Sequence, residues 1–268
     1  MNIMPARNAV MALASPSPAA PSADLAGLRA RVRVIEGSDA AAHGVVRFGV
    51  RAVDAALPWG GLPRGALHEA VAMDAGAGTG FAAALAGRLA QDGGGAVLWC
   101  VRAPVLDAGG LYAPGLGRGG LDPGRLVVVH ARRDSDALWA MEEGLRCPGL
   151  AAVVAEVSAA ALTATRRLQL AAEAGGVTAL LVRPRAWDLG PSAALTRWRV
   201  AAAPATGDAG SDRGGGLGPA RWDVELFRCR GGSPRRWAME WHDETGDFAV
   251  AAAVRDRPAV PQPARLAG

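Results

Sequence analysis

The sequence predicts an α/β fold: a parallel or mixed sheet flanked by helices, followed by a C-terminal antiparallel β extension. Between residues 45 and 182, continuous apolar runs of strand length alternate with helical segments. This alternation is typical of a parallel sheet that is covered on both faces. Two later strand-like segments, 195–203 and 221–230, have no helix between them. Half of the 268 residues are hydrophobic, which suffices for a sizeable core.

The order of the elements follows from the spacing of apolar residues and from the Asp, Gly and Pro residues at segment ends. Asp24 is expected to cap a first helix over 24–35, whose apolar residues share one face. The next expected elements are a brief strand, a turn and a helix within 45–57, a tight loop at 60–65, a strand at 66–73, a glycine-rich turn at 74–80 and a helix at 81–91. Further strands are expected at 95–101, 126–130, 150–157 and 177–182, with helices at 134–145 and 163–174 and a last hairpin at 236–241 and 248–253.

We predict one folded domain over residues 25–258, between two tails. It comprises a core (45–204), a loop (205–219) and C-terminal strands (220–254). Residues 1–24 and 255–268 have the Ala-, Ser- and Pro-rich composition of a disordered and a flexible tail. No apolar run approaches the roughly 20 residues of a membrane span, and Ser15–Pro18 interrupts the short apolar run that a signal peptide would use. We therefore expect a cytoplasmic protein without membrane contact.

All 29 basic residues are arginine, and none is lysine. This excludes a Schiff-base enzyme and an intact phosphate-binding loop, whose lysine contacts the outer phosphates. The net charge of +4 and the pI of about 9.7 suit contacts with phosphate or carboxylate groups, but a GC-rich genome that encodes Arg in place of Lys explains them equally well. The three cysteines and four histidines lack the spacing of a metal site or a disulfide framework, so we predict no metal and no cofactor.

The strand, glycine-rich turn and helix predicted over 66–91 have the outline of a nucleotide-binding loop. In such a loop, backbone N–H groups and a helix N-terminus hold phosphates, a lysine contacts the outer phosphates and a hydroxyl binds magnesium. If Gly80 is the last glycine, Phe81 stands at the lysine position and Ala82 at the hydroxyl position. We therefore interpret the turn as a degenerate, non-functional nucleotide site, whose candidate residues are Asp74, Gly76, Gly78, Thr79 and Gly80.

Residues 46–182 resemble the core of the RecA recombinase superfamily. The segment Val153–Ser158 is similar to the second nucleotide motif of that superfamily, with Glu156 where an aspartate linked to magnesium normally stands. The segment Val101–Pro104 follows the strand after which RecA carries its catalytic glutamate, and it contains no glutamate. The resemblance implies a RecA-like fold that has lost ATPase chemistry, and hence a protein that is not an enzyme.

A closer resemblance, over residues 25–258, is to the ImuA family of bacterial DNA-damage mutagenesis proteins. It is carried by Leu62–Glu69, the degenerate glycine loop, and Arg228–Gly232 followed by Trp237 and Glu240–Trp241. The resemblance implies a non-catalytic adaptor in error-prone translesion synthesis during the SOS response, associated with the nucleoid after damage. The partners that it implies are RecA, an ImuB-like Y-family protein and an error-prone polymerase III-type alpha subunit, with any DNA contact indirect.

The segment Val224–Arg230 is similar to a late RecA strand whose basic pair reaches towards the ATP of a neighbouring subunit. From this similarity we hypothesise that Arg228 and Arg230 dock on the ATP-bearing face of a RecA subunit, so that the protein joins or caps the end of a RecA filament. Trp237 and Trp241 join them as candidate partner-binding residues, because Trp and Arg together are typical of interface hot spots. Strand alternation, with Trp inward and Arg outward, accounts for the same composition without any partner.

Two arginines, Arg183 and Arg185, are candidate DNA contacts. They lie in the short segment 183–192, where RecA carries its second DNA-contacting loop. Two alternative functions stay open: an active ATPase with an atypical phosphate loop, and a cell-division inhibitor of the SulA type. Magnesium-dependent ATP binding would favour the first, and arrest of the polymerisation of the division tubulin homologue would favour the second.

Overall fold

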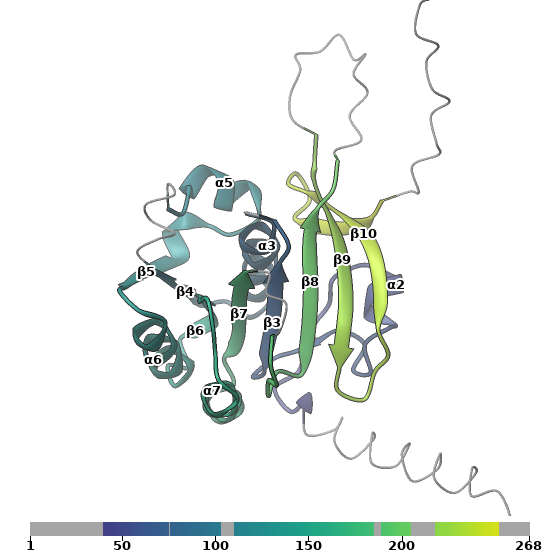
Figure 1. Cartoon of the computed structure of the whole chain (residues 1–268). Coiled ribbons are helices and arrows are strands. Elements are labelled where there is room, and N and C mark those ends of the chain that lie inside the picture. The colour runs from purple at the N-terminus through teal and green to yellow at the C-terminus, as the bar shows by residue number, and fades with distance from the viewer. Residues whose placement is uncertain (1–39, 75, 103–109, 185–188, 205–217, 252–268) are drawn as a thin grey trace, which may run out of the picture.

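The structure, a computed structural model, describes residues 40–74, 76–102, 110–184, 189–204 and 218–251. The helix expected at 24–35, both predicted tails, Arg185 and most of the loop expected at 205–219 lie outside the described residues. Within the described part, the chain forms a nine-stranded sheet with the strand order β11-β10-β9-β8-β3-β7-β6-β4-β5 (Figure 1). A separate two-stranded sheet pairs β1 (Val45–Val46) with β2 (Leu62–Pro63).

The large sheet is parallel in one half and antiparallel in the other. Its parallel strands are β3 (Leu67–Ala72), β4 (Ala96–Arg102), β5 (Leu126–Ala131), β6 (Leu150–Glu156), β7 (Thr178–Pro184) and β8 (Thr196–Ala202). Its antiparallel extension continues from β8 through β9 (Ala220–Cys229), β10 (Arg235–His242) and β11 (Asp247–Val250). The predicted fold class, an α/β core with a C-terminal antiparallel extension, is therefore confirmed.

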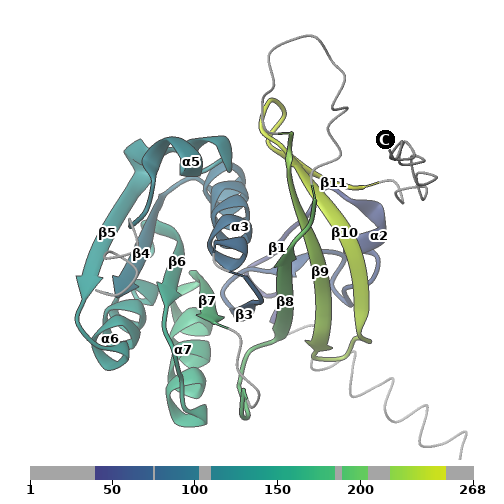
Figure 2. The same cartoon turned by 45° about the horizontal axis from the view of Figure 1, so that its top comes forward.

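Three long helices cover the two faces of the parallel half. One face packs against α3 (Ala77–Gly93), and the other packs against α6 (Asp134–Leu145) and α7 (Leu162–Gly175), as Figures 1 and 2 show. Neighbouring residues of β4 illustrate the alternation, because Trp99 belongs to the core under α3 and Cys100 to the core under α6 and α7.

The helix expected within 45–57 is the four-residue α2 (Arg51–Asp54). Two further short helices appear where the sequence suggested only loose loops: α5 spans Ala113–Arg118, and a 3₁₀ helix spans Pro123–Arg125. Asp122 caps the 3₁₀ helix, because its Oδ1 accepts a hydrogen bond of 2.8 Å from the backbone N–H of Gly124. A proline in the first turn fits both α5 and the 3₁₀ helix, since the N–H that it lacks has no partner within the helix. The described part of the chain holds no helix long and apolar enough to cross a membrane.

The antiparallel extension separates its aromatic residues from its charged residues by strand alternation. The face towards α3 buries Trp198, Trp222, Trp241 and Phe248 together with Phe48 and Phe81. The opposite face carries ion pairs between neighbouring strands, among them Arg199–Glu225 and Arg236–Asp223. The Trp and Arg residues therefore lie on alternate faces of these strands as interpreted, but Arg197 and Arg221 are buried in ion pairs rather than directed outward.

Candidate functional site

The connection between β3 and α3 is a short turn, and the helix begins earlier than predicted. Only residues 73–76 lie between the two elements, and α3 starts at Ala77 rather than at Phe81. Gly76, with a φ of 84°, makes the turn into the helix in the left-handed conformation that glycine tolerates best. The carboxylate of Asp74 accepts a hydrogen bond of 2.8 Å from the backbone N–H of Ala202, which ties the turn to the end of β8.

Two of the predicted loop glycines, Gly78 and Gly80, are residues of α3, and Gly78 allows the helix to pack closely on the sheet. A Cβ atom on Gly78 would lie 2.7 Å from the Cβ of Ala72 and 3.1 Å from the Cγ1 of Val182. A Cβ atom on Gly80 would lie 3.4 Å from the Cζ2 of Trp222. Close contact between α3 and the sheet therefore explains the absence of a side chain at Gly78 without any phosphate, whereas a Cβ atom on Gly80 would make only ordinary van der Waals contact with Trp222.

Phe81, at the predicted lysine position, points into the aromatic core. It is completely buried, and its ring centroid lies 5.9 Å from that of Phe248 and 6.0 Å from that of Trp222. Trp198 and Phe48 lie at 6.3 and 6.5 Å. The position therefore contributes to the packing between α3 and the C-terminal strands.

Two of the predicted nucleotide-site residues contact each other. Glu156, at the carboxyl end of β6, accepts a hydrogen bond of 3.2 Å from the hydroxyl of Thr79 in the first turn of α3. Its other oxygen accepts a hydrogen bond of 2.9 Å from the indole N–H of the fully buried Trp99. Burial raises the pKa of Glu156, while the bonds from Trp99 and Thr79 and the charge of Arg102 act in the opposite direction. Both carboxylate oxygens therefore have protein partners in the place predicted for a magnesium ligand.

The end of β4 carries an arginine close to this cluster. Arg102 forms an ion pair of 2.9 Å with Asp134, the first residue of α6. The carboxylate of Asp134 also accepts backbone hydrogen bonds from Ser158 and Ala159. Residues 103 and 104, the end of the segment Val101–Pro104 that follows the strand after which RecA carries its catalytic glutamate, lie outside the described residues. The described ranges contain no group of three or more His, Cys, Asp or Glu residues that could hold a metal ion.

Arg183 is buried in an ion-pair network, which corrects its assignment as a candidate DNA contact. It is 5% exposed and forms an ion pair of 2.9 Å with Glu69, which is fully buried on β3. Arg197 on β8 pairs with the same carboxylate at 3.1 Å. Because the guanidinium of Arg183 already pairs with Glu69 inside the protein, it is not accessible to a DNA phosphate in this conformation.

The two tryptophans predicted to bind partners belong wholly or partly to the core. Trp241 is 3% exposed, and its indole N–H donates a hydrogen bond of 2.7 Å to the backbone oxygen of Arg118. Trp241 is therefore a core residue, which corrects its assignment as a candidate partner-binding residue. Trp237 is half-buried and packs against the same core, with its ring centroid 6.3 Å from that of Trp198.

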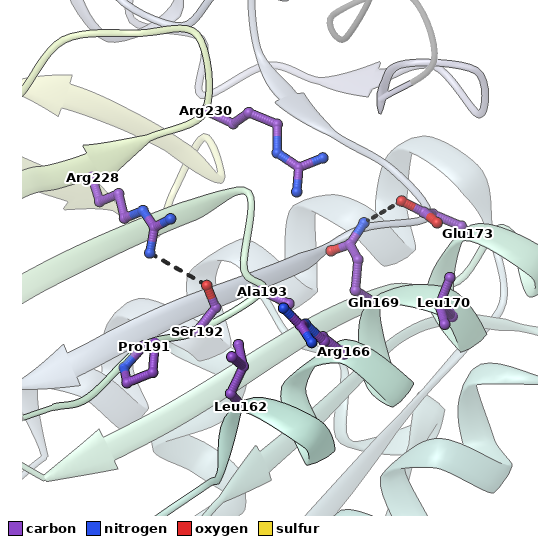
Figure 3. A pocket seen from close by; sticks show the side chains of 10 residues that line it. All are labelled: Leu162, Arg166, Gln169, Leu170, Glu173, Pro191, Ser192, Ala193, Arg228 and Arg230. Carbon is purple, nitrogen blue, oxygen red and sulfur yellow. Dashed lines mark hydrogen bonds between the residues drawn. The ribbon is translucent and has the colours of Figure 1, made fainter.

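Arg228 and Arg230 lie at the exposed end of β9 and line a groove of about 540 Å³ (Figure 3). The groove runs between this end of β9, residues 191–193 and one side of α7. Arg228 donates a hydrogen bond of 3.3 Å to the backbone oxygen of Ser192. Arg166 and Leu170 of α7 also line the groove. The sequence does not single them out, because the spacing of residues in α7 does not show which of its exposed residues face β9.

By fold and site, the chain is an α/β protein in which Thr79 at the start of α3, Glu156 at the end of β6 and Trp99 on β4 form a hydrogen-bonded cluster. It is similar to Protein ImuA of Caulobacter vibrioides strain NA1000 / CB15N, with 40% identity over 210 residues that cover 73% of this chain and 83% of that protein. Protein ImuA of the CB 15 strain gives the same values. No family model matches. At this identity and coverage, the chain belongs to the ImuA family.

Proposed function

We propose that this chain is a non-catalytic adaptor in DNA-damage-induced, error-prone translesion synthesis. The relationship to Protein ImuA carries this proposal, and it supports a part in DNA-damage-induced mutagenesis. In the proposed role, a RecA-like domain bridges RecA and a translesion polymerase complex that contains an ImuB-like Y-family protein and a polymerase III-type alpha subunit. Any contact with damaged DNA would run through these partners.

The absence of ATPase chemistry is part of the proposal, and the geometry of the strand–turn–helix unit supports it. Phosphoryl transfer depends on positioned positive charge and a bound metal ion. Here Phe81 packs into the core, and Thr79 and Glu156 bind each other. In the described part of the chain, the start of α3 therefore has Phe81 where a phosphate-binding loop has lysine, and the carboxylate of Glu156 is already bound by protein groups.

Equilibrium dialysis with labelled ATP and magnesium tests the non-catalytic part of the proposal. The full chain is expected to retain no more ATP than bovine serum albumin does in a parallel chamber. Tight binding that depends on magnesium would instead favour an ATPase with an atypical phosphate loop. A Thr79→Ala variant is the matched control, because it removes the remaining hydroxyl at the helix start and would weaken any genuine magnesium-dependent binding.

The adaptor role is tested by affinity purification of the tagged chain from cells treated with a DNA-damaging agent, followed by mass spectrometry. We expect RecA, the ImuB-like protein or the polymerase alpha subunit among the recovered proteins. Recovery of none of these would contradict the proposal. Recovery of the division tubulin homologue instead would favour an inhibitor of the SulA type.

We propose further that Arg228 and Arg230 contribute to RecA binding, since both are exposed at the end of β9. The variant Arg228→Ala/Arg230→Ala is expected to bind purified RecA at least about tenfold more weakly, which corresponds to the loss of charge-assisted contacts. The variant Arg132→Ala/Arg235→Ala removes two exposed arginines elsewhere and should bind RecA like the wild type. Circular dichroism checks that each variant is folded, and full-strength binding by the first variant would refute the proposal.

A further inference from the structure

We propose that the groove between α7 and the end of β9 binds a short peptide segment of a partner protein that carries acidic residues beside an apolar residue. This proposal deepens the adaptor function by assigning a surface and a ligand chemistry, and it rests on that function for the existence of the partner. Figure 3 shows the side chains that line the groove. Three of them are the arginines Arg166, Arg228 and Arg230, which come from two different elements.

The charge of the groove favours an acidic ligand. Among the residues that the structure describes, no carboxylate forms an ion pair with Arg166, Arg228 or Arg230, although most other described arginines have such a partner. Arg167, next to Arg166 on α7, pairs with Glu142 at 2.5 Å. The groove contains one carboxylate, that of Glu173, which already accepts a hydrogen bond of 2.7 Å from Gln169.

The three guanidinium groups can each form bidentate hydrogen bonds with carboxylates. Arg228 is held by its bond to the backbone of Ser192, so part of the entropy cost of ordering its long side chain is already met before a ligand binds. Because the groove is partly open, these contacts lie near the surface and should weaken as the salt concentration rises.

The apolar side of the groove favours a peptide over a nucleic acid backbone. Leu170 on α7 is 65% exposed, although most leucines in the described part of the chain are buried. Leu162 and Pro191 line the same groove. A peptide with an apolar side chain between its carboxylates would contact these apolar residues as well as the arginines, whereas a phosphate backbone would leave Leu170 without a contact. A volume of about 540 Å³ falls within the roughly 300–1,000 Å³ of ligand-binding pockets and suits a short segment.

Selection of a random peptide library displayed on phage, with the purified full-length chain as bait, tests the proposal. We expect enriched peptides with Asp or Glu around Leu, Ile or Phe, and binding that weakens with added sodium chloride. Synthetic copies of these peptides should bind the variant Arg166→Ala/Arg228→Ala/Arg230→Ala at least about tenfold more weakly, which is about 1.4 kcal/mol. Leu170→Ser should also weaken binding, because it removes the apolar contact and leaves the charges in place.

The matched control is Arg132→Ala/Arg167→Ala/Arg235→Ala, which removes the same charge from exposed positions outside the groove and should bind the peptides like the wild type. Enrichment of non-acidic peptides, no enrichment, or equal binding to both triple variants would overturn the proposal. So would a labelled single-stranded oligonucleotide that bound the groove in preference to every selected peptide. Since the selection uses no RecA and no polymerase, its failure is distinguishable from failure of the adaptor function.

Discussion

His68 lies on β3, is 2% exposed and belongs to a chain of hydrogen bonds. Its Nε2 lies 2.9 Å from the backbone oxygen of Pro63, which can only accept, so Nε2 carries a proton. Its Nδ1 lies 2.7 Å from the hydroxyl of Thr196, and that hydroxyl accepts a bond from the indole N–H of Trp198. The Thr196 hydroxyl can donate to Nδ1 of a neutral ring, and burial of the ring favours this neutral form.

The neutral state of His68 predicts a loss of stability in mild acid. Burial lowers its pKa from 6.5 to about 4, although the bond to Pro63 acts in the opposite direction. Between these values the unfolded chain binds a proton that the folded chain does not, so stability falls as the pH falls from 6.5 towards 4. From the shift, His68 should make the free energy of unfolding about 2 kcal/mol lower at pH 5 than at pH 7.5.

Urea unfolding followed by tryptophan fluorescence measures this effect, and a His68→Gln variant isolates it. The variant should be less stable at pH 7.5, because it disturbs the hydrogen-bond chain, but its stability should decline less between pH 7.5 and pH 5. Identical declines for the variant and the wild type would show that His68 does not titrate in this way.

Glu156 predicts a pH dependence of the opposite sign. Because burial raises its pKa, the folded chain holds a proton that the unfolded chain releases, and stability falls as the pH rises from about 4.5 through the folded pKa. In a Glu156→Gln variant, the amide oxygen can accept from Trp99 and the amide N–H₂ can donate to the Thr79 hydroxyl. We expect a higher urea midpoint than in the wild type at pH 8, with a smaller difference at pH 4.5.

Glu156→Ala provides the contrast, because it leaves the buried indole N–H of Trp99 without its acceptor. The free energy of unfolding of that variant should be about 1–3 kcal/mol lower than that of the wild type. A lower midpoint for Glu156→Gln than for the wild type at pH 8 would mean that the negative charge stabilises the cluster and that the burial argument is wrong.

At the scale of single elements, sequence patterns located α6 well and α3 poorly. The predicted helix 134–145 has the bounds of α6, because Asp134 and Asp136 mark its first turn and its apolar residues keep helical spacing. For α3, the run of glycines before Phe81 was interpreted as turn, yet the helix contains Gly78 and Gly80. A glycine that bends the chain and a glycine that lets a helix approach a sheet look alike in sequence, since both depend on the missing side chain.

Helix α3 also predicts that Gly87 cannot be replaced by alanine without cost. A Cβ atom there would overlap the backbone oxygen of Gly120 and lie 2.6 Å from its carbonyl carbon. Alanine favours a helix by about 1 kcal/mol over glycine, but displacement of the backbone should outweigh this gain, so Gly87→Ala should destabilise by about 1–3 kcal/mol.

Gly93→Ala is the matched control in the same helix, because its Cβ would meet only the flexible guanidinium of Arg64, at 2.9 Å. That substitution should change the free energy of unfolding by about 0.5 kcal/mol or less. Urea unfolding of both variants measures the two changes in the free energy of unfolding. Equal stability of the two would show that α3 and the segment at Gly120 are not in rigid contact.

For the whole molecule, the sequence predicts which residues of the C-terminal strands face inward, but it does not predict the groove that forms beside the end of β9. Strand alternation placed Trp222 and Trp241 on the side that the structure shows to be buried, and it argued against the interface assigned to Trp241. The groove was missed because Arg166 and Arg228 are far apart in sequence, and only the packing of α7 beside the end of β9 brings them together.

The last prediction concerns the whole fold, because Phe81 joins α3 to the C-terminal half of the sheet through Trp198, Trp222 and Phe248. Phe81→Lys would supply the lysine that a phosphate-binding loop needs, yet it would place an unpaired ammonium inside an aromatic core. Burial of such a charge is strongly unfavourable, and loss of the ring alone costs about 3–5 kcal/mol. Since whole proteins are stable by only about 5–15 kcal/mol, we expect Phe81→Lys to unfold most of the chain and to confer no ATP binding.

Phe81→Leu separates the effect of charge from the effect of volume, because it keeps an apolar side chain. Its free energy of unfolding should be only about 1–2 kcal/mol lower than that of the wild type. Urea unfolding and equilibrium dialysis with labelled ATP and magnesium are the measurements for both variants. A Phe81→Lys protein that folded with the stability of the wild type and bound ATP with magnesium would show that the start of α3 can still form a nucleotide site. That result would contradict both the packing role of Phe81 and the non-catalytic function proposed from it.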